Sequence, residues 1–98
     1  MSIPLERDND GYLVNRDIWT PEIAQNLADL DGMVLDEIKW DHIHKARKYY
    51  DEFGVVPPIR KFSKYVAMDQ KEIFKIWMTG PMKTITKYGG LPKPTGCV

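Results

Sequence analysis

Glycine and proline interrupt this chain of 98 residues so often that only short elements fit between them. The breaks are Gly32, Gly54, Pro57-Pro58, Gly80-Pro81 and Gly89-Gly90. Glycine commonly ends a helix, and proline inside a helix removes a backbone hydrogen bond, so each interval holds at most one short element. A chain of this length also has room for one hydrophobic core, which predicts a single small domain.

Five intervals carry helix-start signals or apolar residues near helical spacing. The expected helices are 21–31, 37–53, 59–66, 70–78 and 81–88. Thr20 is a typical N-cap residue in front of Pro21, and Asp69 precedes Glu72 by three residues, the spacing of a capping box. We expect the longest segment, 37–53, to be the central helix of the core.

Apolar side chains predict which faces of the first two helices are buried. They are Ile23, Leu27 and Leu30 in the first helix, and Ile38, Ile43, Ala46, Tyr50 and Phe53 in the second. Spacings of three, four and seven residues place such side chains on one helical face, which then packs against the core.

The N-terminal stretch IPLERDNDGYLVN carries two short extended runs around Asp8-Asn9-Asp10-Gly11. Asp-Gly and Asn-Gly clusters supply the positive φ angles of a tight turn, and the runs therefore predict an N-terminal β-hairpin. The residues by themselves thus predict a mainly α fold, with about five helices and one small hairpin.

The chain ends GGLPKPTGCV, and this end carries its only cysteine, Cys97. Pro92 and Pro94 lack backbone donors and favour extended neighbours, so no helix is expected beyond the glycine pair. We therefore divide the chain into a helical domain, residues 1–90, and an arm, residues 91–98, which would span about 25 Å if fully extended. Such an arm would bury little apolar area and would expose the thiol to a partner. An idle exposed thiol is the alternative.

Composition and the N-terminal residues indicate a soluble cytoplasmic protein. Hydrophobic residues make up 43% of the chain and aromatic residues 11%, as in ordinary globular domains. No apolar run approaches the roughly 18 to 20 residues of a membrane span, and the first ten residues lack the pattern of a signal peptide. A single cysteine cannot form the internal disulfides that are usual in small secreted domains.

Charge is divided along the chain, although the net charge is zero. Residues 1–40 carry nine Asp or Glu against three Lys or Arg, whereas residues 53–98 carry two acids against eight bases. This asymmetry is consistent with an acidic partner or a nucleic acid that contacts the C-terminal half. A solvated polar face is the alternative interpretation.

Four stretches together resemble the DsrC/TusE family of sulfur-trafficking proteins: the ending GGLPKPTGCV, GYL near the start, Trp40, and PPIR after the longest helix. The resemblance extends from about Ile3 to Val98. It implies an orthogonal helical bundle with an N-terminal hairpin and a helix-turn-helix-like core. It also implies that Cys97 carries sulfur as a persulfide, without a cofactor. The arm residues expected to contact partners are Gly90, Leu91, Pro92, Lys93, Pro94 and Gly96.

A thiolate carrier attacks the terminal sulfur of a donor persulfide and holds that sulfur until an acceptor enzyme takes it. The chain would then be a sulfurtransferase in the carrier sense, without turnover of its own. Cations expected to stabilise the thiolate or steer the arm into an acidic partner are Lys93 on the arm and Arg60, Lys83 and Lys87 on the body. Ordinary solubilising charge is the alternative for each.

One position distinguishes the branches of the family. DsrC proteins of dissimilatory sulfur metabolism carry a second cysteine eleven residues before the last one, and this chain has Thr86 there. The TusE branch, which relays sulfur toward 2-thiouridine in tRNA, also lacks that cysteine, and it implies a TusBCD-like donor and a tRNA thiolase as partners. The ending PTGCV resembles DsrC endings at least as closely, so a DsrC-like partner of dissimilatory sulfite reductase is the alternative.

A helix-turn-helix-like pair around Pro57-Pro58 raises a different class of function, nucleic-acid binding. Arg60, Lys61 and Lys64 follow on the second helix of the pair and are suited to contacting phosphates or base edges. The zero net charge makes this a weak electrostatic footprint, and we do not expect direct binding.

His42 and His44 raise the further possibility of a metal site. Residues two apart on a helix point to different sides, and no cluster of Cys or His accompanies this pair. The sequence therefore predicts no metal site.

Overall fold

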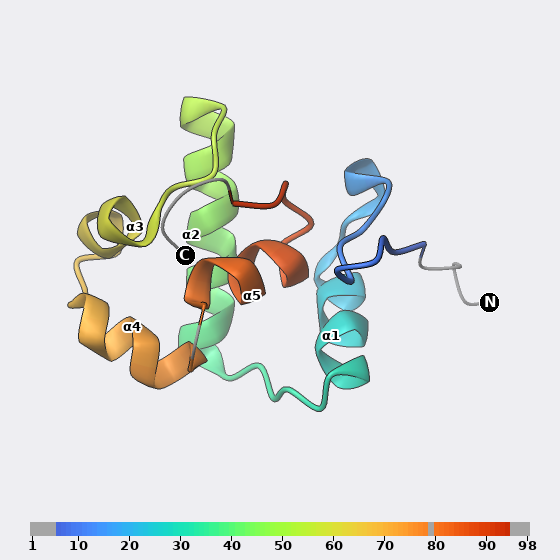
Figure 1. Ribbon diagram of the computed structural model, residues 1–98, viewed down its shortest axis with the longest axis horizontal. Coiled ribbons are helices and arrows are strands. Elements are labelled where there is room, and N and C mark those ends of the chain that lie inside the picture. Colours follow the sequence, from blue (N-terminus) through green and yellow to red (C-terminus); the bar gives the residue numbers. More distant parts are fainter. Residues whose placement is uncertain (1–5, 79, 95–98) are drawn as a thin grey trace.

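The computed structural model describes residues 6–78 and 80–94 and folds them into five α-helices and one short 3₁₀ turn (Figure 1). These elements are η1 (Arg16–Ile18), α1 (Pro21–Leu30), α2 (Glu37–Phe53), α3 (Ile59–Tyr65), α4 (Gln70–Trp77) and α5 (Pro81–Tyr88). The mainly helical prediction is confirmed, and each of the five predicted helices is present with ends within about one residue of those expected.

Local signals at the helix ends explain this agreement. The Thr20 side chain accepts a hydrogen bond from Ile23 N at 3.3 Å, and Asp36 accepts one from Lys39 N at 3.1 Å. Asp69 caps α4 by accepting from Lys71 N at 3.2 Å. Gly54 ends α2 in the left-handed conformation, with φ of +72°. Each cap satisfies backbone groups that the helix itself leaves unpaired, so a few neighbouring residues determine each boundary.

The helix with the most extensive contacts is α5, and the longest helix, α2, which we expected at the centre, makes its main contact with α5. α5 contacts α1, α2 and α4, while α4 also packs against α3. In Figure 1, α5 lies across α2, with α1 on one side and the α3–α4 pair on the other. The large side chains that this arrangement buries completely include Phe62, Ile73, Trp77, Met82 and Tyr88. The last helix therefore holds the other elements together.

The predicted buried faces of α1 and α2 are wrong at their C-terminal ends. Leu30 is 60% exposed and Phe53 is 58% exposed, because both lie in the last turn, beyond the part of each helix that packs on the core. The buried positions of the two helices are Ile23, Ala24, Leu27 and Ala28 on α1, and His42, Ile43, Ala46 and Tyr49 on α2.

The predicted N-terminal hairpin is not supported, because the described residues contain no β-strand and only one isolated antiparallel bridge, between Arg7 and Leu13. The chain does reverse there: Asp8 N donates to Tyr12 O at 2.8 Å. After one bridge, however, the chain enters the turn η1, which Asn15 caps, and the pairing with the preceding segment ends. A two-residue pairing without a third strand does not form a sheet. Ile3 to Leu5, the start of the expected hairpin, lie outside the described residues.

Among residues 6–78 and 80–94, no helix combines the length and the apolar character that crossing a membrane requires.

Candidate functional site

The C-terminal end of α5 determines the direction in which the tail leaves the helix. Gly89 N donates to Ile85 O at 2.9 Å, and Leu91 N donates to Thr86 O at 3.0 Å. Between them, Gly90 has a φ of +64°, the left-handed conformation of a Schellman motif. A Cβ atom on Gly90 would lie 2.6 Å from Cδ1 of Trp19, which is closer than any side chain tolerates. Position 90 therefore requires glycine for two reasons: the left-handed backbone conformation and the close contact with the Trp19 side chain.

Two side chains from distant parts of the chain donate hydrogen bonds to the carbonyl groups at the C-terminal end of α5. Trp19 Nε1 donates to Tyr88 O at 2.7 Å, and the Arg47 guanidinium donates to Gly89 O. Arg47 also stacks on the Trp19 ring, with Cζ 3.9 Å from the ring centroid. Helix C-termini leave carbonyls without intrahelical partners, and a cation there also complements the helix dipole. The tail thus starts from a fixed point.

The expectation that the tail buries little apolar area is wrong at its first residue. Leu91 is only 5% exposed and belongs to the hydrophobic core. Two residues later, the Lys93 ammonium lies 3.1 Å from a carboxylate oxygen of Asp8 and 2.7 Å from one of Asp10. The prolines do exclude a helix, as predicted, but an extended segment still packs when it offers a leucine and a cation to the body. Residues 91–94 therefore lie against the helical domain.

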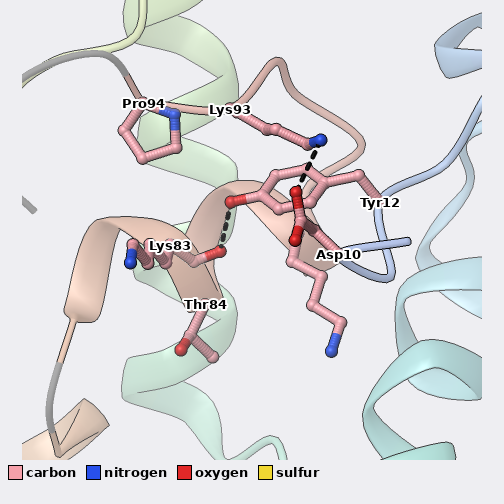
Figure 2. A pocket seen from close by; sticks show the side chains of 7 residues that line it. Asp10, Tyr12, Lys83, Thr84, Lys93 and Pro94 are labelled. Carbon is pink, nitrogen blue, oxygen red and sulfur yellow. Dashed lines mark hydrogen bonds and ion pairs between the residues drawn. The ribbon is translucent and has the colours of Figure 1, made fainter. Parts of the chain in front are cut away.

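A pocket of about 390 Å³ lies between this segment, the N-terminal turn and α5 (Figure 2). Its lining residues are Asp10, Tyr12, Lys83, Thr84, Lys87, Lys93 and Pro94. Three of these are lysines and one is a carboxylate, so the pocket carries a net positive charge. Figure 2 shows the Tyr12 ring between Lys93 and the backbone of Lys83.

Tyr12 anchors the N-terminal turn to α5. Its hydroxyl lies 2.9 Å from Lys83 O and 2.9 Å from Thr86 Oγ1. The Thr86 hydroxyl donates to Met82 O at 2.6 Å, and the Thr86 side chain is fully buried. Burial raises the pKa of Tyr12 above its ordinary value, so the phenol stays protonated and remains a donor. The position where a second cysteine would stand is therefore a packed part of the core beneath Tyr12.

The lysines at the pocket differ in their partners. Lys87 forms an ion pair with Asp31 at 2.6 Å, and Tyr88 donates to the same carboxylate at 2.9 Å. Burial alone would raise the pKa of Asp31, but these two hydrogen bonds, together with the positive charges of Lys87 and Arg7, lower the pKa below its ordinary value. Lys83 has no carboxylate within ion-pair distance in the part of the chain that the structure describes. Lys83 is therefore available to an anion from outside.

The structure brings together most of the residues that the sequence singled out. Gly90 to Pro94 form the base of the tail, and Lys83 and Lys87 line the pocket beside it. Arg60 does not join them, because it is exposed on α3 and does not line this pocket. Cys97 and Gly96 lie outside the described residues. What the cations do for the thiolate stays a prediction.

Sequence reasoning missed the residues that hold the base of the tail: Asp8, Asp10, Tyr12, Trp19 and Arg47. Asp8 and Asp10 carried a signal, but it was interpreted as a hairpin turn. The charge asymmetry of the chain was a second signal, since Lys93 and Lys87 from its basic half pair with Asp8, Asp10 and Asp31 from its acidic half. Part of the charge asymmetry therefore serves ion pairs within the molecule and needs no external partner to explain it.

The two histidines lie in different surroundings. His42 is fully buried and accepts a hydrogen bond from Trp77 Nε1, whereas His44 is exposed and stacks on Trp40 with ring centroids 5.9 Å apart. Within residues 6–78 and 80–94, no three His, Cys, Asp or Glu side chains are grouped to hold a metal ion. Arg60, Lys61 and Lys64 are exposed on α3, and nucleic-acid binding by them stays a prediction.

Comparison with characterised proteins relates this geometry to a family. A chain from Nitratidesulfovibrio vulgaris named the gamma subunit of dissimilatory-type sulfite reductase is 38% identical and covers 95% of this chain and 90% of its own length. The sulfurtransferase TusE of Pectobacterium atrosepticum is 35% identical, covering 93% of this chain and 90% of its own.

Solved structures share the fold. Allochromatium vinosum DsrC superposes with a TM-score of 0.84 at 36% identity, covering 94% of this chain and 88% of that one. The oxidized gamma subunit of the Archaeoglobus fulgidus sulfite reductase gives a TM-score of 0.80 at 33% identity, covering 96% and 92%. The family described as "DsrC like protein" matches residues 2–98. The resemblance carried by the four sequence stretches is therefore confirmed over nearly the whole sequence and over the fold, and the chain belongs to the DsrC-like family, which includes the TusE sulfurtransferases.

Proposed function

We propose that this chain is a sulfur carrier that accepts and passes on persulfide sulfur at Cys97. The observation that carries the proposal is the fixed base of the tail: Leu91 is buried, Lys93 is ion-paired, and the lysine-lined pocket lies directly beside them. Only two residues, Thr95 and Gly96, separate the last described one, Pro94, from the sole thiol of the chain. The membership of the family supports the same role.

The transfer chemistry needs no cofactor and no external oxidant. The Cys97 thiolate attacks the outer sulfur of a donor persulfide, the sulfur–sulfur bond of the donor breaks, and the donor leaves as a thiolate. Cys97 then holds the outer sulfur as a persulfide anion until an acceptor thiolate attacks it in the same way. Lysine ammonium groups favour both anions, and Lys83 and Lys93, which line the pocket beside the base of the tail, are the candidates for this role.

The attachment of residues 91–94 shortens the reach that the free tail would have. The three extended residues from Pro94 to Cys97 span about 10 Å, whereas the six from Leu91 to Cys97 would span about 20 Å if the arm were free from Leu91 onward. While the base stays attached, a donor or acceptor must bring its reactive sulfur close to the pocket. Partners are therefore expected to contact α5 and the N-terminal turn as well as the tail.

Among sulfur pathways, we propose a TusE-like relay toward 2-thiouridine in tRNA, with a TusBCD-like donor and a tRNA thiolase as acceptor. The residue that supports this choice is Thr86, which is fully buried and hydrogen-bonded where two-cysteine relatives would carry their second thiol. One thiol can carry a persulfide but cannot close an internal disulfide. A DsrC-like role as a partner of dissimilatory sulfite reductase is the second candidate, favoured by the 38% identity to a gamma subunit of that enzyme.

Intact-mass spectrometry tests the carrier role. After incubation with a persulfide donor, the wild-type chain should gain the mass of one sulfur atom, and Cys97→Ser should gain none. A gain that persists in Cys97→Ser would refute the proposal. The persulfidated chain is then offered separately to a tRNA thiolase and to a dissimilatory sulfite reductase, and loss of the added sulfur to one of them identifies the branch.

Nucleic-acid binding through α3 is tested by the shift of labelled tRNA and duplex DNA on a gel at several salt concentrations. No shift is expected at physiological salt. A salt-dependent shift that is lost in Arg60→Ala/Lys61→Ala/Lys64→Ala but survives deletion of residues 91–98 would instead favour that function.

A further inference from the structure

The turn formed by residues 8–12 is prepared to receive a cation. The Asp8 carboxylate accepts hydrogen bonds from Asp10 N at 2.9 Å and from Tyr12 N at 3.0 Å, which fixes the shape of the turn. The Tyr12 hydroxyl, 2.9 Å from Lys83 O, joins the turn to α5. The Asp8 carboxylate is therefore held in place whether or not Lys93 is bound, and the turn places Asp10 two residues further along. Lys93 contacts both of them, at 3.1 and 2.7 Å.

The base of the tail thus has two attachments of different strength. Leu91 is 5% exposed and is held by apolar contacts that salt does not weaken. Lys93 is 48% exposed and Asp10 is 63% exposed, so their ion pair is open to solvent and to screening ions. An exposed ion pair shifts an equilibrium by about fivefold or less, which makes the second attachment easy to open.

We propose that Asp8 and Asp10 are positioning residues for the sulfur-carrying tail, and that their ion pairs with Lys93 form a latch that sets the reach of Cys97. With the latch closed, the free span starts at Pro94 and three residues cover about 10 Å. With the latch open, the span starts at Leu91 and six residues cover about 20 Å. This inference rests on the proposed function, because it assigns the tail a transfer role.

The chemistry of the pocket indicates what opens the latch. Lys83 lies in the same pocket as Lys93 and has no carboxylate partner among the described residues. An acidic side chain of a docking partner would bind Lys83 and compete with Asp8 and Asp10 for Lys93. The tail would then lengthen when the partner is bound and remain short otherwise.

The latch is measured with a nitroxide label on Cys97, the only cysteine of the full chain. Electron paramagnetic resonance reports the fraction of label that moves freely. At low salt we expect Asp8→Asn/Asp10→Asn to raise the ratio of mobile to restricted label several-fold over wild type, and Lys93→Gln to do the same. Added salt should raise this ratio in wild type but not in the two variants. Asn keeps an acceptor oxygen at position 8, so the turn itself is retained.

Two controls separate a latch from a general effect of charge or folding. Asp17→Asn removes an exposed carboxylate from η1 and should leave the ratio at the wild-type value. Lys93→Arg keeps the cation and should keep the label restricted. An unchanged ratio in both latch variants, with helical circular dichroism intact, would overturn the inference. So would a wild-type ratio that does not respond to salt. Because this measurement needs no sulfur, its failure is distinct from a failure of Cys97 to take up persulfide.

Discussion

Trp77 on α4 donates a hydrogen bond of 2.8 Å from Nε1 to Nδ1 of His42 on α2, inside the core. Because Nδ1 accepts, the neutral imidazole carries its proton on Nε2, which has no hydrogen-bond partner among the described residues. Phe62 packs edge-on against the same ring, with centroids 5.5 Å apart. If Nδ1 of His42 were also protonated, two N–H donors, on His42 and Trp77, would face each other and the hydrogen bond would be lost. Protonation of His42 therefore opposes folding, which makes stability depend on pH.

The first prediction is that stability falls as the pH drops below about 6.5, the ordinary value for histidine. Burial lowers the pKa of His42, so between its folded and unfolded values the unfolded chain binds more protons, and the free energy of unfolding decreases with decreasing pH. The loss between pH 7 and pH 5 is at most about 2 kcal/mol from this residue. Thermal melting at a series of pH values measures it.

His42→Gln should flatten this pH dependence, and His44→Gln, at the exposed position, should not. The Asp8 and Asp31 carboxylates do not affect this comparison, because their pKa values lie below the ordinary value of 3.8 and their contributions to stability are lost only at lower pH. An equal slope in wild type and His42→Gln would contradict the assignment.

The second prediction concerns the buried start of the tail. Leu91→Ala should destabilise the protein by about 2 kcal/mol or more, because it removes a nearly fully buried leucine side chain. For a domain of this size, that corresponds to a fall in melting temperature of about 8 °C or more. Leu30→Ala is the matched control, since Leu30 is exposed and its loss should cost about 0.5 kcal/mol or less. Similar melting temperatures for the two variants would show that Leu91 contributes no packing.

The third prediction separates two reasons for glycine at position 90. Gly90→Ala adds a methyl group 2.6 Å from Trp19 Cδ1 at a φ of +64°, whereas Gly54→Ala adds one at a similar φ of +72° with nothing within 4 Å. Both variants should lose about 1 kcal/mol through the backbone. Gly90→Ala should lose about 1 to 3 kcal/mol more through overpacking. Urea denaturation of both proteins measures the difference in their free energies of unfolding. Equal losses would mean that the Trp19 side chain moves aside without a loss of stability.

The fourth prediction concerns Thr86, the position of the missing second cysteine. In Thr86→Cys/Cys97→Ser, the new thiol should react slowly with a thiol reagent in the folded protein and rapidly in denaturant, because Thr86 is fully buried. Thr84→Cys/Cys97→Ser provides the matched control, since Thr84 lines the pocket and its replacement should react readily. Equal native rates would show that the region beneath Tyr12 opens freely.

With Cys97 retained, Thr86→Cys extends the same test. We expect an internal disulfide on mild oxidation of the dilute protein, formed more slowly than disulfides with small thiols because position 86 must first become accessible. The two Cα atoms must approach to about 4.4 to 6.8 Å. Two free thiols that persist without dimer formation would mean that the tail does not reach position 86.

The helix boundaries and the special character of the tail followed from the sequence by itself. Thr20, Asp69 and Gly54 mark helix ends through contacts within four residues, and such contacts form wherever the segment is placed. Pro92 and Pro94 exclude a helix for the same local reason, and the single cysteine places any thiol chemistry at Cys97.

Only the tertiary structure decided which ends of the helices are buried and what the N-terminal turn and the base of the tail do. Leu30 and Phe53 fit the helical period, but whether a last turn is covered depends on where its neighbour ends. The pairs Lys93 with Asp8, and Arg47 with Gly89, join residues far apart in the chain. The helical spacing of apolar residues and the residues that cap helices depend only on neighbours along the sequence. The long-range contacts exist because packing α5 against α1, α2 and α4 brings distant charges and carbonyl groups together.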